Sequence, residues 1–376
     1  MRGLWKLTVS AVGHGVRCVP FRLHSGRPPA PLGARILTNP DDVLQHNMWD
    51  HVQWSPEEFE TAKQKAEENS RDRIPVEEQV RYERDAHQYW NGFYERHHNK
   101  FFKNRQWLFS EFPELLPPGS ETDHTSGGQK RGDTDQVSRG SSHIASLSDS
   151  PEVLREQQQQ QQQDTSYSFA VKSQETVAFP GQHASFRILE VGCGAGHSAF
   201  PIMKTIRERE TFLYCIDFSS RAIQLVKEHP DYDPAVCHAF VHNVCDGASL
   251  FPFPPGSLDV ILVVFVLSSI HPERLQGVVN RLASYLKHGG SILFKDYGRY
   301  DLAQLRFKKG QCLSDNFYTR QDGTRVYFFT KEEVHQMFTD AGLEEIQNLE
   351  DKRLQVNRGK KVVMRRVWIQ SKYRKP

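Results

Sequence analysis

The stretch of sequence that decides the fold is Ile188-Leu189-Glu190-Val191-Gly192-Cys193-Gly194-Ala195-Gly196. Its apolar first half, together with the preceding Phe186, predicts a buried strand, and residues 197–209 after it predict a helix. Glycine has no Cβ atom, so the glycines between strand and helix allow the backbone to approach a ligand closely. Because ligands of open α/β sheets bind beyond the carboxyl ends of the strands, this turn predicts a binding site.

The rest of the C-terminal half alternates between strand-like and helix-like segments. Further strands are expected at 212–216, 239–242, 258–267 and 291–295, and helices at 219–228, 272–286 and 330–340. After residue 295 a long loop is expected, and two late strands near 344–349 and 366–370. This alternation is typical of a doubly wound, mostly parallel sheet, so the predicted fold class is α/β.

The N-terminal part of the chain predicts a helical extension to that sheet. Ser55 followed by Pro56 predicts the start of a charged helix that runs to Asn69. A second helix is expected from Val76 to His98, because apolar residues recur there at steps of three and four. The apolar stripe of this second helix consists of Val76, Val80, Ala86, Trp90 and Phe93 or Tyr94.

Two acidic residues sharpen the interpretation of the glycine-rich turn. Glu190 precedes the turn, and Asp217 ends the next expected strand, where a carboxylate can accept hydrogen bonds from ribose hydroxyls. In this context the motif resembles that of class I (Rossmann-like) methyltransferases, which implies S-adenosyl-L-methionine as the cofactor. Residues 241–246 and 263–265, after the third and fourth strands, are then expected to flank the adenine.

Several longer strings narrow the resemblance. They are Tyr89-Trp90-Asn91-Gly92-Phe93-Tyr94, Lys100-Phe101-Phe102-Lys103-Asn104-Arg105-Gln106-Trp107-Leu108, Phe265-Val266-Leu267-Ser268-Ser269-Ile270-His271-Pro272, and the segments 295–301, 305–310 and 316–330. These strings are similar to those of the methyltransferase-like tRNA N3-methylcytidine enzymes. The resemblance implies methylation of a cytidine in the tRNA anticodon loop, at tRNA position 32. The basic N-terminus makes the chain look like the mitochondrial branch, whose expected substrates are mitochondrial threonine and serine tRNAs.

The resemblance also implies the cofactor-binding residues. They are Trp90, Tyr94, Gly192, Asp217, Asn243, Val244 and Val264. Without the resemblance, Trp90 and Tyr94 would be interpreted as core residues of an amphipathic helix. The chain departs from the family pattern at Asn243, where many relatives have Asp. The Asn carbonyl can accept a hydrogen bond from the adenine amino group without a charge, and Asp246 is a candidate substitute.

Basic and aromatic residues near the C-terminus predict RNA binding. Residues 352–376 contain ten Lys or Arg and no acidic residue, and cations alternate with aromatic residues over 295–325. Cations can neutralise phosphates, and aromatic rings can stack on unpaired bases. The predicted RNA-binding residues are Arg306, Lys308, Lys309, Arg325 and Arg358. The expected partner is the tRNA anticodon stem-loop, and the resemblance adds a seryl-tRNA synthetase as a candidate partner. A plain solvated surface is the alternative.

The predicted reaction requires little acid–base chemistry. N3 of neutral cytosine has a lone pair and no proton, so transfer requires a flipped, aligned base in a dry pocket. The base becomes positively charged, which a nearby carboxylate would stabilise. Asp296, just past the strand at 291–295, is the hypothetical catalytic residue. The alternative roles for Asp296 are a salt bridge to Arg299 or a loop cap.

The remaining sequence divides the chain into segments. Residues 1–40 carry Arg and Lys but no acid, which predicts a mitochondrial transit peptide over 1–25 rather than a secretory signal, with a basic tail as the alternative. Residues 26–116 form the helical region, which is expected to contribute to cofactor and tRNA binding. Residues 117–180, with an unbroken Gln run at 157–163, predict a disordered linker. Residues 181–376 then form the methyltransferase domain.

Localisation and function keep alternatives at this stage. The mitochondrial matrix is expected, or the cytoplasm or nucleus if the N-terminus is not cleaved or is skipped. No membrane span and no metal site are expected. The rival functions are methylation of another acceptor, such as mRNA, a protein or a small molecule, and a non-catalytic RNA-binding pseudo-methyltransferase.

Overall fold

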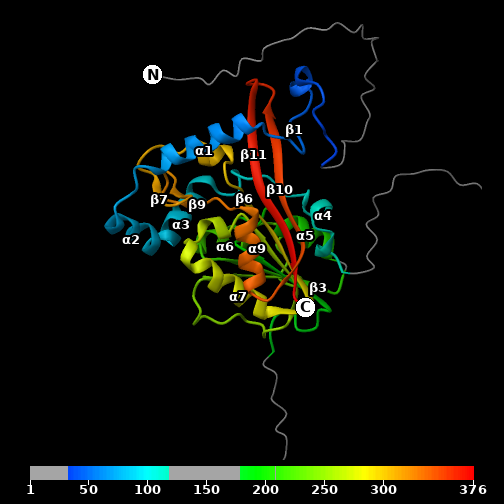
Figure 1. Cartoon of the computed structure of the whole chain (residues 1–376). Helices are drawn as coiled ribbons and strands as arrows, with labels where there is room; N and C mark the ends of the chain where they lie inside the picture. Colours follow the sequence, from blue (N-terminus) through cyan, green and yellow to red (C-terminus); the bar gives the residue numbers. More distant parts are fainter. Residues whose placement is uncertain (1–32, 118–177, 208) are drawn as a thin grey trace, which may run out of the picture.

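The computed structural model describes residues 33–117, 178–207 and 209–376, so the predicted transit peptide and nearly all of the predicted linker lie outside the described residues. An eight-stranded sheet forms the centre, in the order β1-β10-β11-β6-β5-β2-β3-β4 (Figure 1). Its strands are β1 (Met48–Trp49), β2 (Phe186–Val191), β3 (Thr211–Asp217), β4 (Cys237–Val241), β5 (Leu258–Val264), β6 (Leu286–Tyr297), β10 (Glu344–Asn357) and β11 (Val362–Arg374). A second sheet contains β7 (Cys312–Ser314), β8 (Phe317–Thr319) and β9 (Arg325–Tyr327).

Helices cover both faces of the large sheet. The α-helices are α1 (Pro56–Ser70), α2 (Val76–Arg84), α3 (Ala86–His97), α4 (Leu108–Glu111), α5 (Ala199–Ile206), α6 (Ser220–Lys227), α7 (Leu275–Tyr285), α8 (Leu302–Leu305) and α9 (Lys331–Asp340). Short 3-10 helices are η1 (Pro40–Leu44), η2 (Pro113–Leu115), η3 (Leu267–Ser269) and η4 (Pro272–Arg274).

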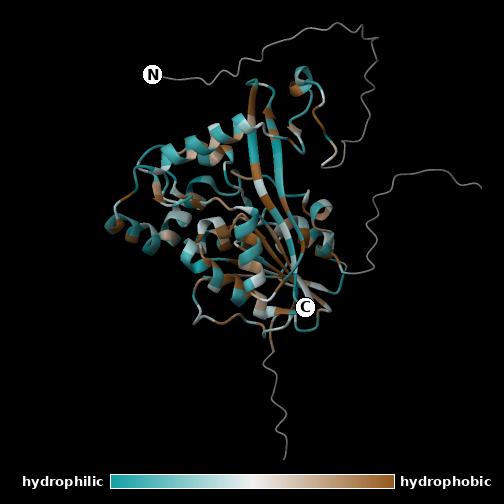
Figure 2. Ribbon diagram, in the orientation of Figure 1, coloured by the Kyte–Doolittle hydropathy of each residue, from teal (hydrophilic) through white to brown (hydrophobic). Residues whose placement is uncertain are grey.

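The predicted α/β class is confirmed by the pairing of the strands. β6, β5, β2, β3 and β4 run parallel, whereas β11, β10 and β1 add antiparallel strands at one side. Alternate side chains of β2 point to opposite faces, so Leu189 packs in one apolar cluster with α7 and α9. Ile188 packs in the other cluster, with α4, α5 and α6. Figure 2 shows these central strands as the most apolar part of the ribbon.

Two predicted helix starts are confirmed. The Ser55 hydroxyl accepts a hydrogen bond from the Glu58 backbone N–H, and the Glu58 carboxylate accepts one from the Ser55 backbone N–H. Together these two bonds cap α1. Thr330 and Glu333 form the same reciprocal cap on α9. Each cap satisfies two backbone donors that a helix would otherwise leave unbonded.

The single helix predicted from Val76 to His98 is wrong. The chain instead forms α2 and α3 with a break at Asp85, whose backbone leaves the helical region. The expected apolar stripe is divided by this break. Phe93 and Tyr94 of α3 are buried, whereas Val76 and Val80 of α2 are 72% and 58% exposed. The break therefore lets α3 pack on the large sheet domain while α2 turns an apolar surface outward.

The segment between β6 and α9 is more structured than predicted. It contains α8 and the small sheet β7-β8-β9, whose three-residue strands are too short for a period to show in the sequence. The two late strands are also longer than predicted, because β10 and β11 form one hairpin paired from Glu344–Arg374 to Asn357–Val362. Figure 1 shows this hairpin extending well beyond the parallel strands.

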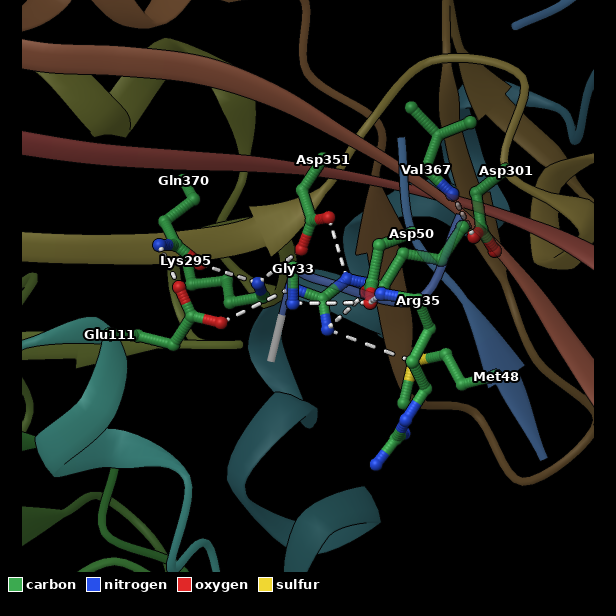
Figure 3. A network of polar contacts seen from close by, with 11 residues as sticks. Gly33, Arg35, Met48, Asp50, Glu111, Lys295, Asp301, Asp351, Val367 and Gln370 are labelled. Carbon is green, nitrogen blue, oxygen red and sulfur yellow. Dashed lines mark hydrogen bonds and ion pairs between the residues drawn. The ribbon is translucent and has the colours of Figure 1, made fainter. Parts of the chain in front are cut away.

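A buried ionic network fixes the hairpin to the N-terminal segment (Figure 3). Arg353 of β10 forms ion pairs with Asp50 at 3.3 Å, Glu111 at 3.2 Å and Asp351 at 2.6 Å. Lys295 of β6 adds a pair with Asp351 at 2.6 Å, while burial, as the largest influence, lowers the pKa of Lys295. The network thus joins β6, β10, α4 and the segment that directly follows β1.

Two further observations concern the described residues only. None of their helices is long and apolar enough to cross a bilayer, and no group of three or more His, Cys, Asp or Glu among them is arranged to hold a metal ion. The five described cysteines are free thiols, and all except Cys245 are buried.

Candidate active site

A pocket of about 360 Å³ lies at the carboxyl ends of the parallel strands. Its walls come from the turn after β2, the end of β3, the loop after β4, the turn after β5 and helices α2 and α3. Of the predicted cofactor residues, Trp90, Tyr94, Gly192, Asp217, Asn243 and Val244 line this pocket. The structure thus brings together residues that lie more than a hundred positions apart in the sequence.

The glycine-rich turn leaves no room for side chains. Gly192 has a φ of +63°, and a Cβ atom built there would lie 2.5 Å from Cγ2 of Val266. A Cβ atom on Gly194, with a φ of +54°, would lie 2.5 Å from the Tyr94 hydroxyl. Both positions therefore require glycine for the backbone conformation and for the space. The turn brings its own backbone against the pocket, as the sequence predicts.

Asp217 is fixed at the end of β3 by backbone donors. Its Oδ2 accepts the Gly194 N–H at 3.0 Å, and its Oδ1 accepts the Ser219 N–H at 2.8 Å. Burial raises the pKa of Asp217 to about 6, while the bonds from Ser219 and Gly194 act in the opposite direction. Each carboxylate oxygen keeps a further lone pair, so Asp217 can bind two neighbouring hydroxyl groups at the pocket.

Helix α3 brings Trp90 and Tyr94 against the same turn. The two rings stack with centroids 5.9 Å apart, and Tyr94 packs in a buried cluster with Phe93, Ala195 and Ala222. Asn91 holds α3 in place, because its side-chain oxygen accepts the Ser219 hydroxyl at 2.7 Å. The N-terminal helical region is therefore part of the pocket wall rather than a separate unit.

The loop after β4 forms the next wall. Arg281 of α7 holds this loop through bonds to the carbonyls of Val244, Asp246 and Ser249. Asn243 is exposed, and its Oδ1 accepts the Cys245 N–H at 3.0 Å in a local turn. Asp246 accepts the Ala248 N–H at 3.0 Å and does not line the pocket, so the structure gives no support to Asp246 as a substitute for an acid at 243.

Val264 lies differently from the other predicted cofactor residues. Its side chain is buried in the core cluster beneath the site and does not line the pocket. The next two residues, Phe265 and Val266, line the pocket instead. Phe265 adopts a φ of +60°, unusual for a residue other than glycine, directly after the end of β5.

Asp296 does not line the pocket. It is fully buried, and it accepts the Ser268 N–H at 3.0 Å and the Tyr297 N–H at 2.9 Å. Burial raises the pKa of Asp296 to about 6. These bonds fix the turn of residues 265–269, which carries three of the pocket residues, so the structure supports a positioning role. Arg299 is bound to Glu333 instead, which removes the alternative of an Asp296–Arg299 ion pair.

Glu190 and Arg105 form a charged layer beneath the turn. Burial raises the pKa of Glu190 to about 7, although the Arg105 guanidinium acts in the opposite direction. Arg105 donates to the Ser198 hydroxyl at 2.9 Å and lies 5.5 Å from the centroid of the Phe265 ring. Sequence reasoning did not assign Arg105 a role, although it stands in one of the strings that carry the family resemblance.

Comparisons with known proteins agree with this geometry. Residues 151–348 match a protein family described as "Methyltransferase domain". The tRNA N(3)-cytidine methyltransferase METTL2 of Danio rerio is 50% identical to the chain over 343 residues, covering 91% of this chain and 88% of the relative. The chain belongs to the tRNA N(3)-cytidine methyltransferase family. The tRNA N(3)-cytidine methyltransferase METTL2B of Homo sapiens is 49% identical over 92% of this chain and 93% of the relative.

A mitochondrial member of the tRNA N(3)-cytidine methyltransferase family is also similar. Mitochondrial METTL8 of Mus musculus is 48% identical over 283 residues, which cover 73% of this chain and 99% of the relative. This similarity supports a relation to a mitochondrial branch of the family. The METTL2 relatives are equally similar and carry no such designation, so identity alone does not separate the two branches.

The pocket of this family member fits its cofactor, S-adenosyl-L-methionine. Gly192 exposes its backbone to the pocket without a side chain, and the Asp217 carboxylate lines the pocket beside it. Trp90 and Tyr94 provide the aromatic wall, and Val244 adds an apolar contact next to Asn243. The cofactor supplies a methyl group on a sulfonium, and these residues would hold and orient it.

The predicted RNA-binding residues fall into two groups in this tRNA N(3)-cytidine methyltransferase. Arg306, Lys308, Lys309 and Arg358 are exposed, as a surface for phosphates requires. Arg325 is only 7% exposed and lies in the pocket wall, where its guanidinium pairs with Glu83. The basic segment 352–376 lies mostly in the β10–β11 hairpin, where six of its cations form ion pairs, namely Lys352, Arg353, Arg365, Arg366, Lys372 and Arg374.

The mouth of the pocket contains residues that sequence reasoning missed. Glu83 of α2 binds two arginines at once, with Oε1 2.8 Å from Arg274 and Oε2 in contact with Arg325. Burial acts to raise the pKa of Glu83, but the two guanidiniums hold it below its ordinary value. His271 lies beside them and belongs to one of the strings that carry the family resemblance. No local pattern signals Glu83, because its partners are 191 and 242 residues away.

Proposed function

We propose that this chain transfers a methyl group from S-adenosyl-L-methionine to N3 of the anticodon-loop cytidine at tRNA position 32. The observation that carries the proposal is the match over 88–93% of the length of relatives named for this activity, with the pocket residues present in one site. The relatives' name gives the acceptor atom, and the pocket supplies the means to hold the methyl donor.

The chemistry at the pocket supports such a transfer. Cytosine N3 needs no general base, so the protein has to exclude water and align the two reactants. Trp90, Tyr94 and Phe265 provide aromatic surface around the site, and the buried carboxylate of Asp217 lies behind it. Asp296 supports alignment from behind the 265–269 turn. This division of roles needs no side chain that moves a proton.

The exposed cations provide two surfaces for the RNA. Arg306, Lys308 and Lys309 precede β7 in the small sheet beside α2, and Arg358 lies in the turn between β10 and β11. Phosphate groups bind such cations with a strength that falls steeply as salt increases. We infer that the anticodon stem-loop contacts these two surfaces while the flipped cytidine enters the pocket.

We infer the mitochondrial matrix as the site of action and mitochondrial threonine and serine tRNAs as the substrates. The similarity to mitochondrial METTL8 supports this, together with the acid-free, Arg-rich composition of residues 1–40. A seryl-tRNA synthetase remains part of the proposal as an assisting partner for the serine tRNA. The proposed transit peptide, residues 1–25, lies outside the described residues.

The test is transfer of a labelled methyl group to purified mitochondrial threonine tRNA. The expected result is one methyl group per tRNA, with no label when the cytidine at position 32 is replaced by uridine. Nuclease digestion should return N3-methylcytidine as the labelled nucleoside. Binding of the cofactor without transfer to this tRNA, to the serine tRNA, or to either with a seryl-tRNA synthetase would reject the proposed acceptor.

A further inference from the structure

A second hollow, of about 340 Å³, adjoins the cofactor pocket. It lies between α2 and the small sheet, which are joined by a bond from the Ile74 N–H to the Cys312 carbonyl at 2.8 Å. Figure 1 shows α2 and β7 on the same side of the molecule. The lining residues are Val76, Gln79, Val80, Tyr82, Glu83, His271, Glu273, Arg274, Leu313, Phe317 and Arg325. Glu83, His271, Arg274 and Arg325 also line the cofactor pocket, so the two hollows share a wall.

One side of this second hollow is apolar and open to solvent. Val76 and Val80 lie one helical turn apart on α2, with 72% and 58% of their surfaces exposed. Phe317 and Leu313 are buried below, and Tyr82 is half-buried beside them. An unpaired base can pack against such an aliphatic surface, because the contact removes apolar area of both partners from water.

The opposite side carries oriented guanidinium groups. Glu83 holds Arg274 and Arg325 as described above, and Arg325 also lies 5.5 Å from the centroid of the Phe317 ring. The side chain of Arg274 is 52% exposed and gives one N–H group to Glu83. Its other donors have no protein acceptor among the described residues, so Arg274 can bind an RNA phosphate while Glu83 fixes its position.

We propose that the second hollow binds a nucleotide that directly flanks the target cytidine. Its base packs against Val76 and Val80, and its phosphate binds Arg274. The inference rests on the proposed function, because the shared wall makes this hollow a neighbour of the pocket that the methylated base is proposed to enter. The occupant is an unpaired RNA nucleotide, recognised by its flat base and its phosphate without selection of base identity.

The charge of the rim gives the proposal a second consequence. The carboxylate of Glu273 is 88% exposed and lies 4.0 Å from His271, close to the proposed phosphate position. It opposes the approach of a phosphate, so Glu273→Gln is expected to tighten RNA binding, with a larger gain at low salt than at high salt. Unchanged or weaker binding by Glu273→Gln at low salt contradicts the phosphate position.

The main experiment measures binding of a fluorescent anticodon stem-loop RNA to the full chain. Val80→Glu puts a charge on the exposed apolar side without disturbing the core, and Ile346→Glu, at a residue 51% exposed on β10, is the matched control. The Kd of Val80→Glu is expected to rise about tenfold, while that of the control stays unchanged. The affinity for S-adenosyl-L-methionine should be the same in all three proteins.

RNAs with an abasic site on either side of the target cytidine identify the occupant. One of the two abasic RNAs should bind the wild-type protein about tenfold more weakly than the intact RNA does. Val80→Glu should bind this abasic RNA and the intact RNA equally well, because the variant has already lost the contact with the base. If both abasic RNAs lose the same affinity with wild type and variant, or lose none, the hollow does not bind a flanking base. This measurement uses RNA binding alone, so it tests the second hollow separately from methyl transfer. Either proposal can therefore be rejected while the other holds.

Discussion

Substitution of Asn243 by Asp is expected to tighten cofactor binding. In the structure the Asn243 side-chain oxygen accepts the Cys245 N–H at 3.0 Å, which leaves one lone pair on that oxygen and an amide nitrogen that can only donate. An amide nitrogen cannot accept a hydrogen bond from the adenine amino group. An Asp would keep the turn with one carboxylate oxygen and offer the second oxygen as an acceptor.

The size of this gain follows from the exposure of the site. A hydrogen bond to a charged group contributes about 1.5–3 kcal/mol when it is shielded from water. Residue 243 is exposed, so solvent screening reduces the gain to about 1 kcal/mol, or roughly a fivefold lower Kd. Titration calorimetry of S-adenosyl-L-methionine with wild type and Asn243→Asp measures this ratio directly.

An analogue whose purine lacks the 6-amino group is the control for the Asn243→Asp measurement. The variant should bind this analogue no more tightly than wild type does, because the new acceptor has no donor to meet. Equal or weaker binding of the natural cofactor by the variant refutes the reasoning. A gain that persists with the analogue also refutes it, because that gain would come from charge alone.

Three further predictions concern the layers around the pocket. Gly192→Ala should lower the free energy of unfolding by about 1–2 kcal/mol, because φ is +63° and the new Cβ would overlap Val266. It should also weaken cofactor binding in calorimetry. Unchanged binding would contradict the argument that the cofactor needs the backbone of this turn at close range. Burial raises the pKa of Glu190 from 4.5 to about 7, so the folded protein bears a desolvated charge above pH 7 that is neutralised as the pH falls. Glu190→Gln should therefore gain stability relative to wild type as the pH rises from 5 to 8, by about 3 kcal/mol at most in denaturant unfolding, and a constant difference contradicts this. Arg353→Ala removes the cation that pairs with the carboxylates of Asp50, Glu111 and Asp351, so it should lower the free energy of unfolding by about 3–5 kcal/mol in the same assay. A decrease below about 1 kcal/mol would show that the network relaxes around the lost side chain.

The parts of the site that sequence predicts are those encoded locally. The turn at Gly192 and the acid at Asp217 each follow an apolar strand, so spacing alone places them at the edge of a parallel sheet. Trp90 and Tyr94 are different, since their periodicity fits an ordinary buried helix face and only the family resemblance assigns them to the pocket. Val264 was predicted to line the pocket, but the lining begins one residue later, at Phe265. The exact end of a strand is the feature that a sequence pattern predicts least reliably.

The parts that sequence does not predict depend on distant pairs. Nothing near Glu83 indicates that it binds Arg274 and Arg325, and a count of cations cannot show that most of those in the hairpin are neutralised. The short strands of the small sheet have no readable period, so the hollow against α2 is also hidden. Tertiary contacts decide all three features.

The placement of β10 at the side of the large sheet bears on aggregation. A fourteen-residue strand with an unpaired edge is a template on which another chain can add a strand. Two features reduce this hazard. β1 pairs with Leu354 and Gln355 and so covers one end of the edge, and the other end bears the exposed charges of Glu344, Glu345 and Glu350. A variant that lost residues 48–49 would uncover backbone groups next to the apolar Val356, so it should precipitate more readily even if its pocket stayed intact.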